Sequence, residues 1–156
     1  MGSQKYNVCL LNDSFPPLID GVANAVINYA NTIHHQLGSA TVVTPSFPGY
    51  TDEYDFPVAR YSSVDTLKQF GYRTGYPFSS SMLENLKESN FDIIHSHCPF
   101  ASTVLGRTLR EKSNAPLIMT YHTKFDEDIK RIIENPIIVS QITKWVVSNI
   151  YSCDEV

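Results

Sequence analysis

The chain has 156 residues, of which 42% are hydrophobic and 18% are charged, and its formal net charge is −4. This length fits one domain with a hydrophobic core, and the composition is typical of a soluble globular protein rather than a disordered or fibrous one. The slight acidity excludes the basic surface of a nucleic-acid-binding protein, and the longest apolar runs are far shorter than the roughly 20 residues that cross a bilayer.

The N-terminal part of the chain predicts two strands around a helix. The continuous apolar run YNVCLLN, residues 6–12, is typical of a strand that is covered on both faces. After the loop DSFPPLID, apolar residues recur with helical spacing over 22–37, and Gly38 ends that pattern. A second strand is expected over 40–44, where Pro45 stops it.

The remaining elements alternate in the same way. Residues 45–75 are rich in aromatic residues, proline and glycine, and they offer one short strand candidate, PVARY. Ser81 and Glu84 indicate a capping box that opens a helix in SSSMLENLKES. The further expected elements are a strand over 91–95, a helix over 99–113, a strand over 115–121 and a helix over 136–151.

Strands of continuous hydrophobicity that alternate with helices predict a doubly wound α/β domain with a mostly parallel, Rossmann-like sheet. We assign residues 1–156 to a single domain of this kind. The closing SCDEV follows a long helix, and in such folds a segment in this position begins the next strand. We therefore expect the chain to be part of a larger protein.

The cysteines and the N-terminus indicate the compartment. Cys9, Cys98 and Cys153 are widely spaced and form neither a CxxC pair nor a dense disulfide pattern, which favours a reducing cytoplasm. Cys9 and Cys153 are expected to be small buried residues inside apolar strands, whereas Cys98 lies beside two histidines. The short apolar run of MGSQKYNVCLLND does not predict a secretion signal.

Polar residues directly follow three of the predicted strands. Residues 13–21 follow the first strand, 95–99 follow FDIIH, and His122-Thr123 follows PLIMTY. In an open parallel sheet, ligands bind at the carboxyl ends of the strands, near the point where the strand order reverses. If the sheet is parallel, these residues share one edge, and we expect a binding cleft there.

The junction Asp20-Gly21-Val22 has two interpretations. A glycine at a helix N-terminus lets free backbone amides approach a phosphate closely, and the helix dipole favours the anion. The alternative is a simple cap and turn at the start of the helix. A single glycine is not the GxGxxG fingerprint, so we expect neither a nicotinamide nor a flavin cofactor.

The histidines of HSH allow more than one chemistry. Alternate residues of a strand point the same way, so His95 and His97 could hold a metal ion with His122 as a third ligand. However, no acidic cluster follows them in the sequence, and the pair His34-His35 lies mid-helix without a matching ligand. We expect no metal site. Instead, we expect His95 to hydrogen-bond to neighbouring loops, and His97 and His122 to project into the cleft.

Three stretches together resemble one family. DSFPPLIDGVANAV, FDIIHSHCPFASTVLGRTLREKSNAPLIMTYHTKFD and SNIYSCDEV are similar to the N-terminal domain of GT-B glycosyltransferases of family 4. The DGV helix entry, HSHxPF and TYHT occur in the family's order, and the resemblance spans almost the whole chain. It is closest to the bacterial branch that glycosylates diacylglycerol or phosphatidylinositol-type lipids. Many family members carry Gly-Gly at Asp20-Gly21, whereas the lipid branch often has Asp there.

The resemblance implies an enzyme of two Rossmann-like halves, in which this chain is the acceptor-side half and the C-terminal nucleotide-sugar-binding half is absent from it. The implied reaction transfers a hexose, with retention, from a nucleotide-sugar such as UDP-glucose to an acceptor hydroxyl, without a cofactor or a required metal. Gly21 and Val22 would face the donor phosphates, and His122 would act at the reacting centre, first by positioning and second as a base. The implied acceptor-side cleft comprises Asp13, Asp20, Arg73, His97, Pro99, Phe100 and Thr123.

The implied acceptor is diacylglycerol or another membrane lipid, so the protein would be cytoplasmic and peripheral on the inner face of the plasma membrane. We expect membrane contact at one of two stretches, because their basic residues could meet anionic headgroups. The first is QFGYRTGYPF, which contains Arg73 and directly follows Lys68, and the second is KFDEDIKRIIENP. A stripe in the last helix is expected to pack on the sheet instead. It consists of Ile138, Ile142, Trp145, Val146 and Ile150.

Functions from other classes stay open on the sequence alone. A metal-dependent hydrolase would bind zinc through His95, His97 and His122. A non-catalytic Rossmann-like binding module would have a sealed strand edge, and a small soluble acceptor could replace the lipid. We expect the 156-residue chain by itself to have no transferase activity, because half of the implied cleft is absent.

Overall fold

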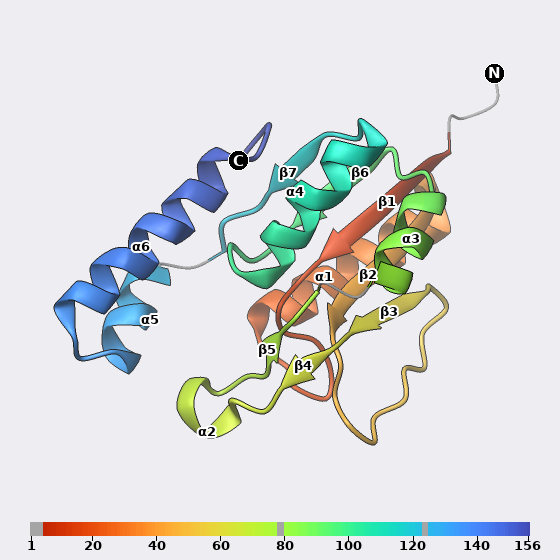
Figure 1. Cartoon of the computed structure of the whole chain (residues 1–156). Helices are drawn as coiled ribbons and strands as arrows, with labels where there is room; N and C mark the ends of the chain where they lie inside the picture. Colours follow the sequence, from red (N-terminus) through yellow and green to blue (C-terminus); the bar gives the residue numbers. More distant parts are fainter. Residues whose placement is uncertain (1–4, 78–79, 123–124) are drawn as a thin grey trace.

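The structure is a computed structural model that describes residues 5–77, 80–122 and 125–156 (Figure 1). At its centre lies a five-stranded parallel sheet in the order β3-β2-β1-β6-β7. This sheet confirms the Rossmann-like, mostly parallel fold that the hydrophobic pattern predicts. Its strands are β1 (Tyr6–Leu11), β2 (Gly38–Pro45), β3 (Val58–Tyr61), β6 (Ile93–Ser96) and β7 (Leu117–Met119).

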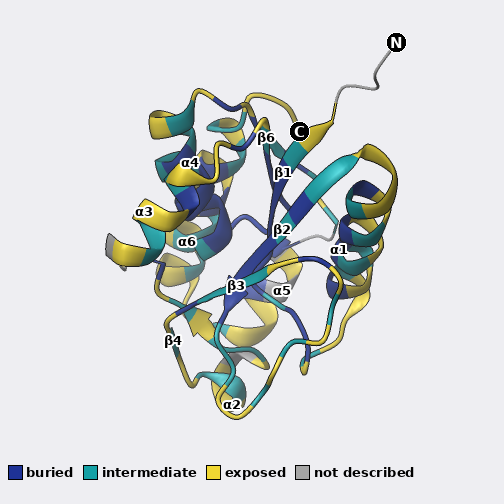
Figure 2. Cartoon of the chain, turned by 90° about the vertical axis from the view of Figure 1, so that its right-hand side faces the viewer, coloured by how far each residue is buried: buried dark blue, intermediate teal, exposed yellow. Residues whose placement is uncertain are grey.

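Helices cover both faces of the sheet. α1 (Gly21–Thr32) lies on one face, and α3 (Ser80–Glu88) and α4 (Ala101–Ser113) lie on the other (Figure 2). Successive residues of β1 point to opposite faces, so Leu10 joins the core beneath α1 and Leu11 joins the core beneath α4. The continuous apolar run of β1 is explained by this double coverage.

Gly38 connects α1 to β2 without a loop. After α1 the chain forms one π-helical turn, Ile33–Leu37, and Gly38 begins β2 with a φ of 153°. A Cβ atom at Gly38 would overlap the backbone of Tyr6 in the neighbouring strand. The prediction that Gly38 ends the helix is confirmed, and β2 starts earlier than predicted because the turn is so tight.

Residues 45–75 contain more structure than their sequence predicts. β3 confirms the strand expected at PVARY. β4 (Ser63–Val64) and β5 (Thr74–Gly75) form a small antiparallel ladder, and α2 (Leu67–Phe70) lies in the connection between them. Gly75 lies against the ring of Tyr61 so closely that a Cβ atom there would overlap it. This close approach holds β5 at the carboxyl end of β3.

The C-terminal part consists of α5 (Phe125–Ile132) and α6 (Pro136–Tyr151), and α6 packs against α4. α6 has the predicted bounds, with Asn135 as its cap and Pro136 in the first turn. Beyond α6, the N–H of Asp154 donates to Leu117 O at 2.7 Å, and Glu155 O accepts from Met119 at 2.9 Å. The segment expected to begin the next strand thus forms one isolated parallel bridge, Glu155 with Ile118, at the edge of the sheet.

Some local predictions are wrong. The stripe of α6 does not pack on the sheet as a unit: Val146 is buried, but Ile138 and Trp145 are 48% and 44% exposed, because α6 lies over α4 and not over a strand. Cys153 lies after α6 and is partly exposed, unlike the buried Cys9. α3 spans Ser80–Glu88, so Ser81 lies within the helix and not at the N-cap position that the capping box predicts.

Candidate active site

The order of the sheet reverses between β1 and β6, which are neighbours at its centre. Such a switch point leaves a crevice at the carboxyl ends of the strands. The loops that follow these strands meet there, since the N–H of His97 donates to Leu11 O at 2.9 Å and the N–H of Ser102 donates to the Asp13 carboxylate at 3.0 Å. The predicted edge therefore exists, and it brings the loops after β1 and β6 together.

Asp13 is buried in this crevice and held by donors from two sides. Its carboxylate accepts hydrogen bonds from the Ser102 N–H at 3.0 Å, the Ser102 hydroxyl at 2.8 Å and the Tyr61 hydroxyl at 3.2 Å. Burial raises the pKa of Asp13, while these hydrogen bonds act in the opposite direction. The carboxyl group is thus a buried acceptor that is held in one orientation.

Asp20 caps α1, as the cap-and-turn interpretation predicts. Its carboxylate accepts hydrogen bonds from the Ala23 N–H and the Ser14 hydroxyl, each at 2.7 Å. A Cβ atom at the exposed Gly21 would meet no described atom within 4 Å, so packing does not require glycine there. The amides of Gly21 and Val22 lie in the first turn, where a helix offers them no acceptor. Their contact with donor phosphates stays a prediction.

The histidines form two hydrogen-bonded pairs with the loop after β7. His95 Nε2 lies 2.8 Å from the Thr120 hydroxyl, which confirms the loop contact expected for His95. His97 Nδ1 lies 2.9 Å from His122 Nε2, and the two rings stack at 24°. Burial, reinforced by neighbouring imidazoles, lowers the pKa of His95 to about 4 and that of His97 to about 2. Burial also lowers the pKa of His122, against the charge of Asp20.

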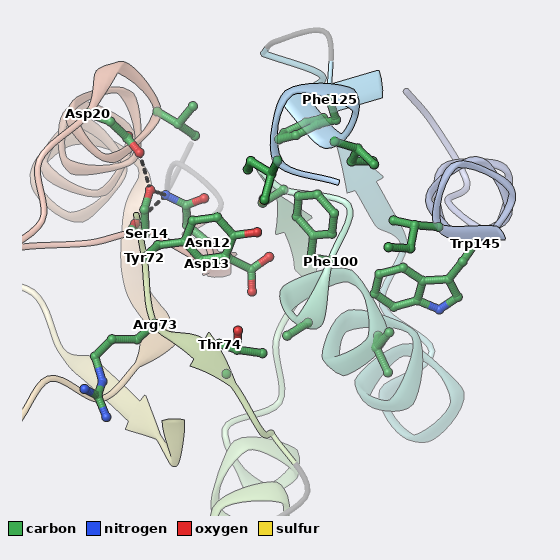
Figure 3. A pocket seen from close by; sticks show the side chains of 18 of the residues that line it. Asn12, Asp13, Ser14, Asp20, Tyr72, Arg73, Thr74, Phe100, Phe125 and Trp145 are labelled. Atoms are coloured by element: carbon green, nitrogen blue, oxygen red, sulfur yellow. Dashed lines mark hydrogen bonds between the residues drawn. The ribbon is translucent and has the colours of Figure 1, made fainter. Parts of the chain in front are cut away.

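A cavity of about 890 Å³ opens at the same edge (Figure 3). The loop after β1 forms its polar end with Asn12, Asp13, Ser14 and Asp20, and most of the remaining lining is apolar. That lining comes from the starts of α1 and α4, from β5, and from α5 and α6. It includes Val22, Thr74, Cys98, Phe100, Val104, Phe125, Ile129, Ile142 and Trp145.

Aromatic side chains from three helical segments build one wall of the cavity. The ring of Phe100, at the start of α4, meets Phe125 of α5 edge-on with centroids 5.3 Å apart, and it lies 6.2 Å from Trp145 of α6 (Figure 3). Edge-to-face contacts of this kind are favourable. Trp145 is therefore exposed because it faces the cavity and not the sheet.

Arg73 belongs to the cavity lining but its guanidinium group is engaged elsewhere. It donates to the Ser63 hydroxyl at 2.8 Å, lies 3.6 Å from Asp65 and sits over the ring of Phe47 at 5.8 Å. In Figure 3 the guanidinium points away from Asp13. Arg73 thus braces the β4–β5 ladder, which forms the lip of the cavity.

The structure collects some of the predicted site residues and separates others. The expectation that His97 projects into the cleft is wrong, because His97 is fully buried against His122. Pro99 is also buried and is not among the lining residues, and its carbonyl accepts a hydrogen bond from Asn149 of α6 at 2.8 Å. His122 is partly exposed but is not among the lining residues, and Thr123 lies outside the described residues. The predicted residues that do line the cavity are Asp13, Asp20, Val22, Arg73 and Phe100.

Several features of the site were not found from the sequence. Asn12 and Ser14 flank Asp13, so their place after β1 was a usable signal. The β5 lip had no signal, because residues 45–75 lack a regular period. The pairing of His97 with His122 joins positions 25 residues apart and depends on β6 and β7 being neighbours.

The described residues give no support to the rival chemistries. They contain no group of three or more His, Cys, Asp or Glu side chains placed to hold a metal ion. His97 and His122 use facing nitrogens for their mutual hydrogen bond. Cys98 is buried, and burial together with the charge of Asp13 raises the pKa of its thiol, so it is no ready nucleophile.

Comparison with known proteins identifies the family of this chain. Over 138 residues the chain is 25% identical to the alpha-monoglucosyldiacylglycerol synthase of Streptococcus pneumoniae, which covers 88% of this chain and 31% of that protein. Over 120 residues it is 23% identical to the protein of the same name from Acholeplasma laidlawii, and this match covers 76% of this chain and 30% of that protein. The chain thus spans about a third of the length of these relatives. Residues 19–152 match the model described as Glycosyltransferase Family 4, and the chain belongs to that family.

Proposed function

We propose that the chain is the acceptor-binding half of a retaining hexosyltransferase, which moves a sugar from a nucleotide-sugar such as UDP-glucose to a hydroxyl group of diacylglycerol or another membrane lipid. Membership of family 4 supports the transferase class. The name of both relatives describes an alpha-glucosylated diacylglycerol. Because the glucose of UDP-glucose is alpha-linked, an alpha-linked product would require retention.

The observation that best supports a lipid acceptor is that the cavity has one polar end and a mostly apolar remainder. Asp13 and Asp20 stand at one end, and most of the remaining lining is apolar. Burial of an acyl chain contributes about 0.8 kcal/mol for each CH₂ group, whereas a free hydroxyl group needs a polar partner. A molecule with a hydroxyl head and an apolar tail matches both ends, and a small soluble acceptor matches one.

Asp13 is suited to orient the acceptor hydroxyl. Its carboxylate is fixed by Ser102 and Tyr61, and its oxygens have acceptor capacity beyond those bonds. A hydroxyl group that donates to Asp13 would be held at the polar end of the cavity with its oxygen free to react. Orientation of this kind contributes to catalysis by reducing the entropy lost on reaching the transition state.

The first turn of α1 is suited to the donor side. The amides of Gly21 and Val22 and the positive end of the helix dipole would stabilise the charge that develops on the departing diphosphate, and this needs no metal ion. The charge of Asp20 raises the pKa of His122 against the effect of burial. In this proposal His122 contacts the sugar or the acceptor between the cavity and the start of α1.

The exposed apolar side chains of α5 and α6 supply a surface for peripheral membrane contact. Within the described ranges no helix combines the length and apolar character needed to cross a bilayer. The basic residues Lys130 and Lys144 stand on the same helices and could meet anionic headgroups on the cytoplasmic side. The exposed apolar residues are Ile132, Ile137, Ile138, Trp145, Val147 and Tyr151.

This surface and the cavity share their helices. Ile129, Ile142 and Trp145 line the cavity from α5 and α6, while Ile137 and Ile138 face outward from the start of α6. A lipid in the membrane could therefore reach the cavity without crossing bulk water. The donor-binding half completes the cleft in this proposal, so the 156-residue chain alone should give no turnover.

The test uses the full-length protein with radiolabelled UDP-glucose and dioleoylglycerol in mixed micelles. We expect a glucolipid whose anomeric carbon is alpha by NMR. Val104→Trp should fill the cavity and lower lipid transfer at least tenfold, whereas Glu111→Trp, on the exposed side of the same helix, should keep it. Transfer to free glycerol alone would contradict the lipid acceptor. No transfer with any nucleotide-sugar would contradict the reaction.

A further inference from the structure

His97 is a buried partner of His122 whose role the proposed reaction does not explain. His97 is completely buried, while His122 is partly exposed. The Nδ1 atom of His97 lies 2.9 Å from the Nε2 atom of His122, and the ring centroids are 5.2 Å apart. The hydrogen bond therefore joins a fixed interior ring to a ring at the surface.

The interior ring is confined by its other neighbours. Tyr29 of α1 packs on His97 with centroids 5.3 Å apart, and His95 of β6 packs on it at 4.0 Å. Among the described residues, the titratable side chains whose rings contact His97 are Tyr29, His95 and His122, and the charge of Asp20 acts on His122. Burial keeps His97 neutral, so it carries one proton on one of its two nitrogens.

The position of that proton follows from the second nitrogen of His97. Its Nε2 atom is buried and has no hydrogen-bond partner among the described residues. If His122 donated to His97, the His97 proton would sit on Nε2, and a buried N–H group would lack an acceptor. If His97 donates from Nδ1, only a lone pair at Nε2 is left unpaired. Orphaned buried N–H groups are rare in proteins, and under-used acceptors are less rare.

We infer that the Nδ1–H of His97 donates to Nε2 of His122 and thereby fixes His122 in the tautomer that carries its proton on Nδ1. The Nε2 lone pair of His122 is then occupied, and its remaining polar group is an N–H donor. The inference rests on the proposed function for its consequence: in this tautomer His122 donates a hydrogen bond to a sugar or acceptor oxygen and is not the base of the reaction. His97 is a positioning residue that acts through His122.

The tautomers can be observed directly. In a long-range ¹H–¹⁵N correlation spectrum of the ¹⁵N-labelled chain, we expect the nitrogen shifts of both His97 and His122 to be those of the Nδ1–H form. His97→Leu should release His122 into a mixture of tautomers. His97→Asn should restore the Nδ1–H form of His122, because the asparagine amide can donate from a position close to that of Nδ1. Amide dispersion in the same spectra shows whether each variant folds.

Kinetics of the full-length protein supply the second measurement. We expect His97→Leu to lower kcat for lipid glucosylation 10- to 100-fold with little change in KM, and His97→Asn to recover to within about threefold of the original rate. An Nε2–H form of His122 in the unaltered chain, or a full kcat in His97→Leu, would overturn the inference. Absence of transfer in the unaltered protein, with the Nδ1–H form present, would instead overturn the proposed function alone.

Discussion

The helices α1 and α6 flank the sheet on opposite sides and use their apolar residues differently (Figure 2). α1 buries Ala23, Val26 and Ala30 against the strands and adds the ring of Tyr29 beside the buried histidines. The buried residues of α6 are Val146 and Asn149, and the second of these is polar. The apolar stripe of α1 is therefore part of the core, and most of the stripe of α6 is not.

The difference teaches that hydrophobicity in a helix does not by itself assign the helix to a core. α6 is anchored by the hydrogen bond from Asn149 to Pro99 and by its contact with α4, while Trp145 faces the cavity and Ile137 is 71% exposed. Exposed apolar side chains in such number are typical of interaction sites. The residues of α1 stabilise the core and bury the histidines beside it, whereas the residues of α6 form a surface for apolar ligands.

The largest expected effect is the difference in stability between an aspartate placed in α1 and one placed in α6. Val26→Asp places a carboxylate without a partner in the core beneath α1, and it should lower the free energy of unfolding by more than about 4 kcal/mol. Ile137→Asp places the same group in the exposed first turn of α6, where the helix dipole favours it, and should change stability by less than about 0.5 kcal/mol. Urea unfolding monitored by circular dichroism measures both, and equal losses would break the comparison.

The second effect concerns the histidines beside α1. His95 and His97 have pKa values of about 4 and about 2 in the folded chain, below the 6.5 of an unperturbed histidine. The folded state thus binds fewer protons than the unfolded state below pH 6.5. The stability contributed by each neutral histidine is complete above pH 6.5 and is lost as the pH falls from 6.5 to the folded pKa of that histidine. Between pH 6.5 and pH 5 each neutral histidine should account for about 2 kcal/mol of lost stability.

The control for this pH effect is His97→Asn, which should lose about 2 kcal/mol less than the unaltered chain over the same interval. Asp13 has a raised pKa and therefore gains stability as the pH falls, but it is common to both proteins and cancels in the difference. Urea titrations at the two pH values give the result. Parallel pH dependence in the two proteins would show that His97 is not held neutral.

The smallest effect concerns the outer surface of α6. Replacing Ile137 and Ile138 by serine in the full-length protein should leave stability within about 1 kcal/mol and weaken binding to anionic lipid vesicles about tenfold. Sedimentation with vesicles containing phosphatidylglycerol measures the binding. If binding is unchanged while unfolding becomes easier, this surface is covered by another part of the protein and not by the membrane.

The sequence predicted the elements whose residues repeat regularly. The apolar runs of β1, β2 and β6 and the helical period of α1 predicted the parallel sheet, because burial on both faces leaves a clear pattern, whereas the strand order and the switch point came from the structure. The β4–β5 ladder was missed because it depends on the contact between Gly75 and Tyr61, which lie in different strands.

For the site, the sequence named single residues but not their contacts. Asp13 was found because it follows a strand at the correct edge, whereas Phe100 was named only through the family resemblance. The burial of His97 and its hydrogen bond to His122 could not be predicted, because they depend on how β6 and β7 pair and on the ring of Tyr29 above them. The role of Trp145 was misassigned because an apolar period looks the same whether it faces a sheet or a cavity.

The central claim is that the apolar cavity holds the tail of the acceptor. Its most direct test is photolabelling of the chain with diacylglycerol that carries a diazirine in its acyl chain, followed by peptide mass spectrometry. The account predicts labels at the cavity-facing residues Phe100, Val104, Phe125, Ile129 and Trp145, and loss of those labels in Val104→Trp. Labels confined to other surfaces, or labels unaffected by Val104→Trp, would contradict it.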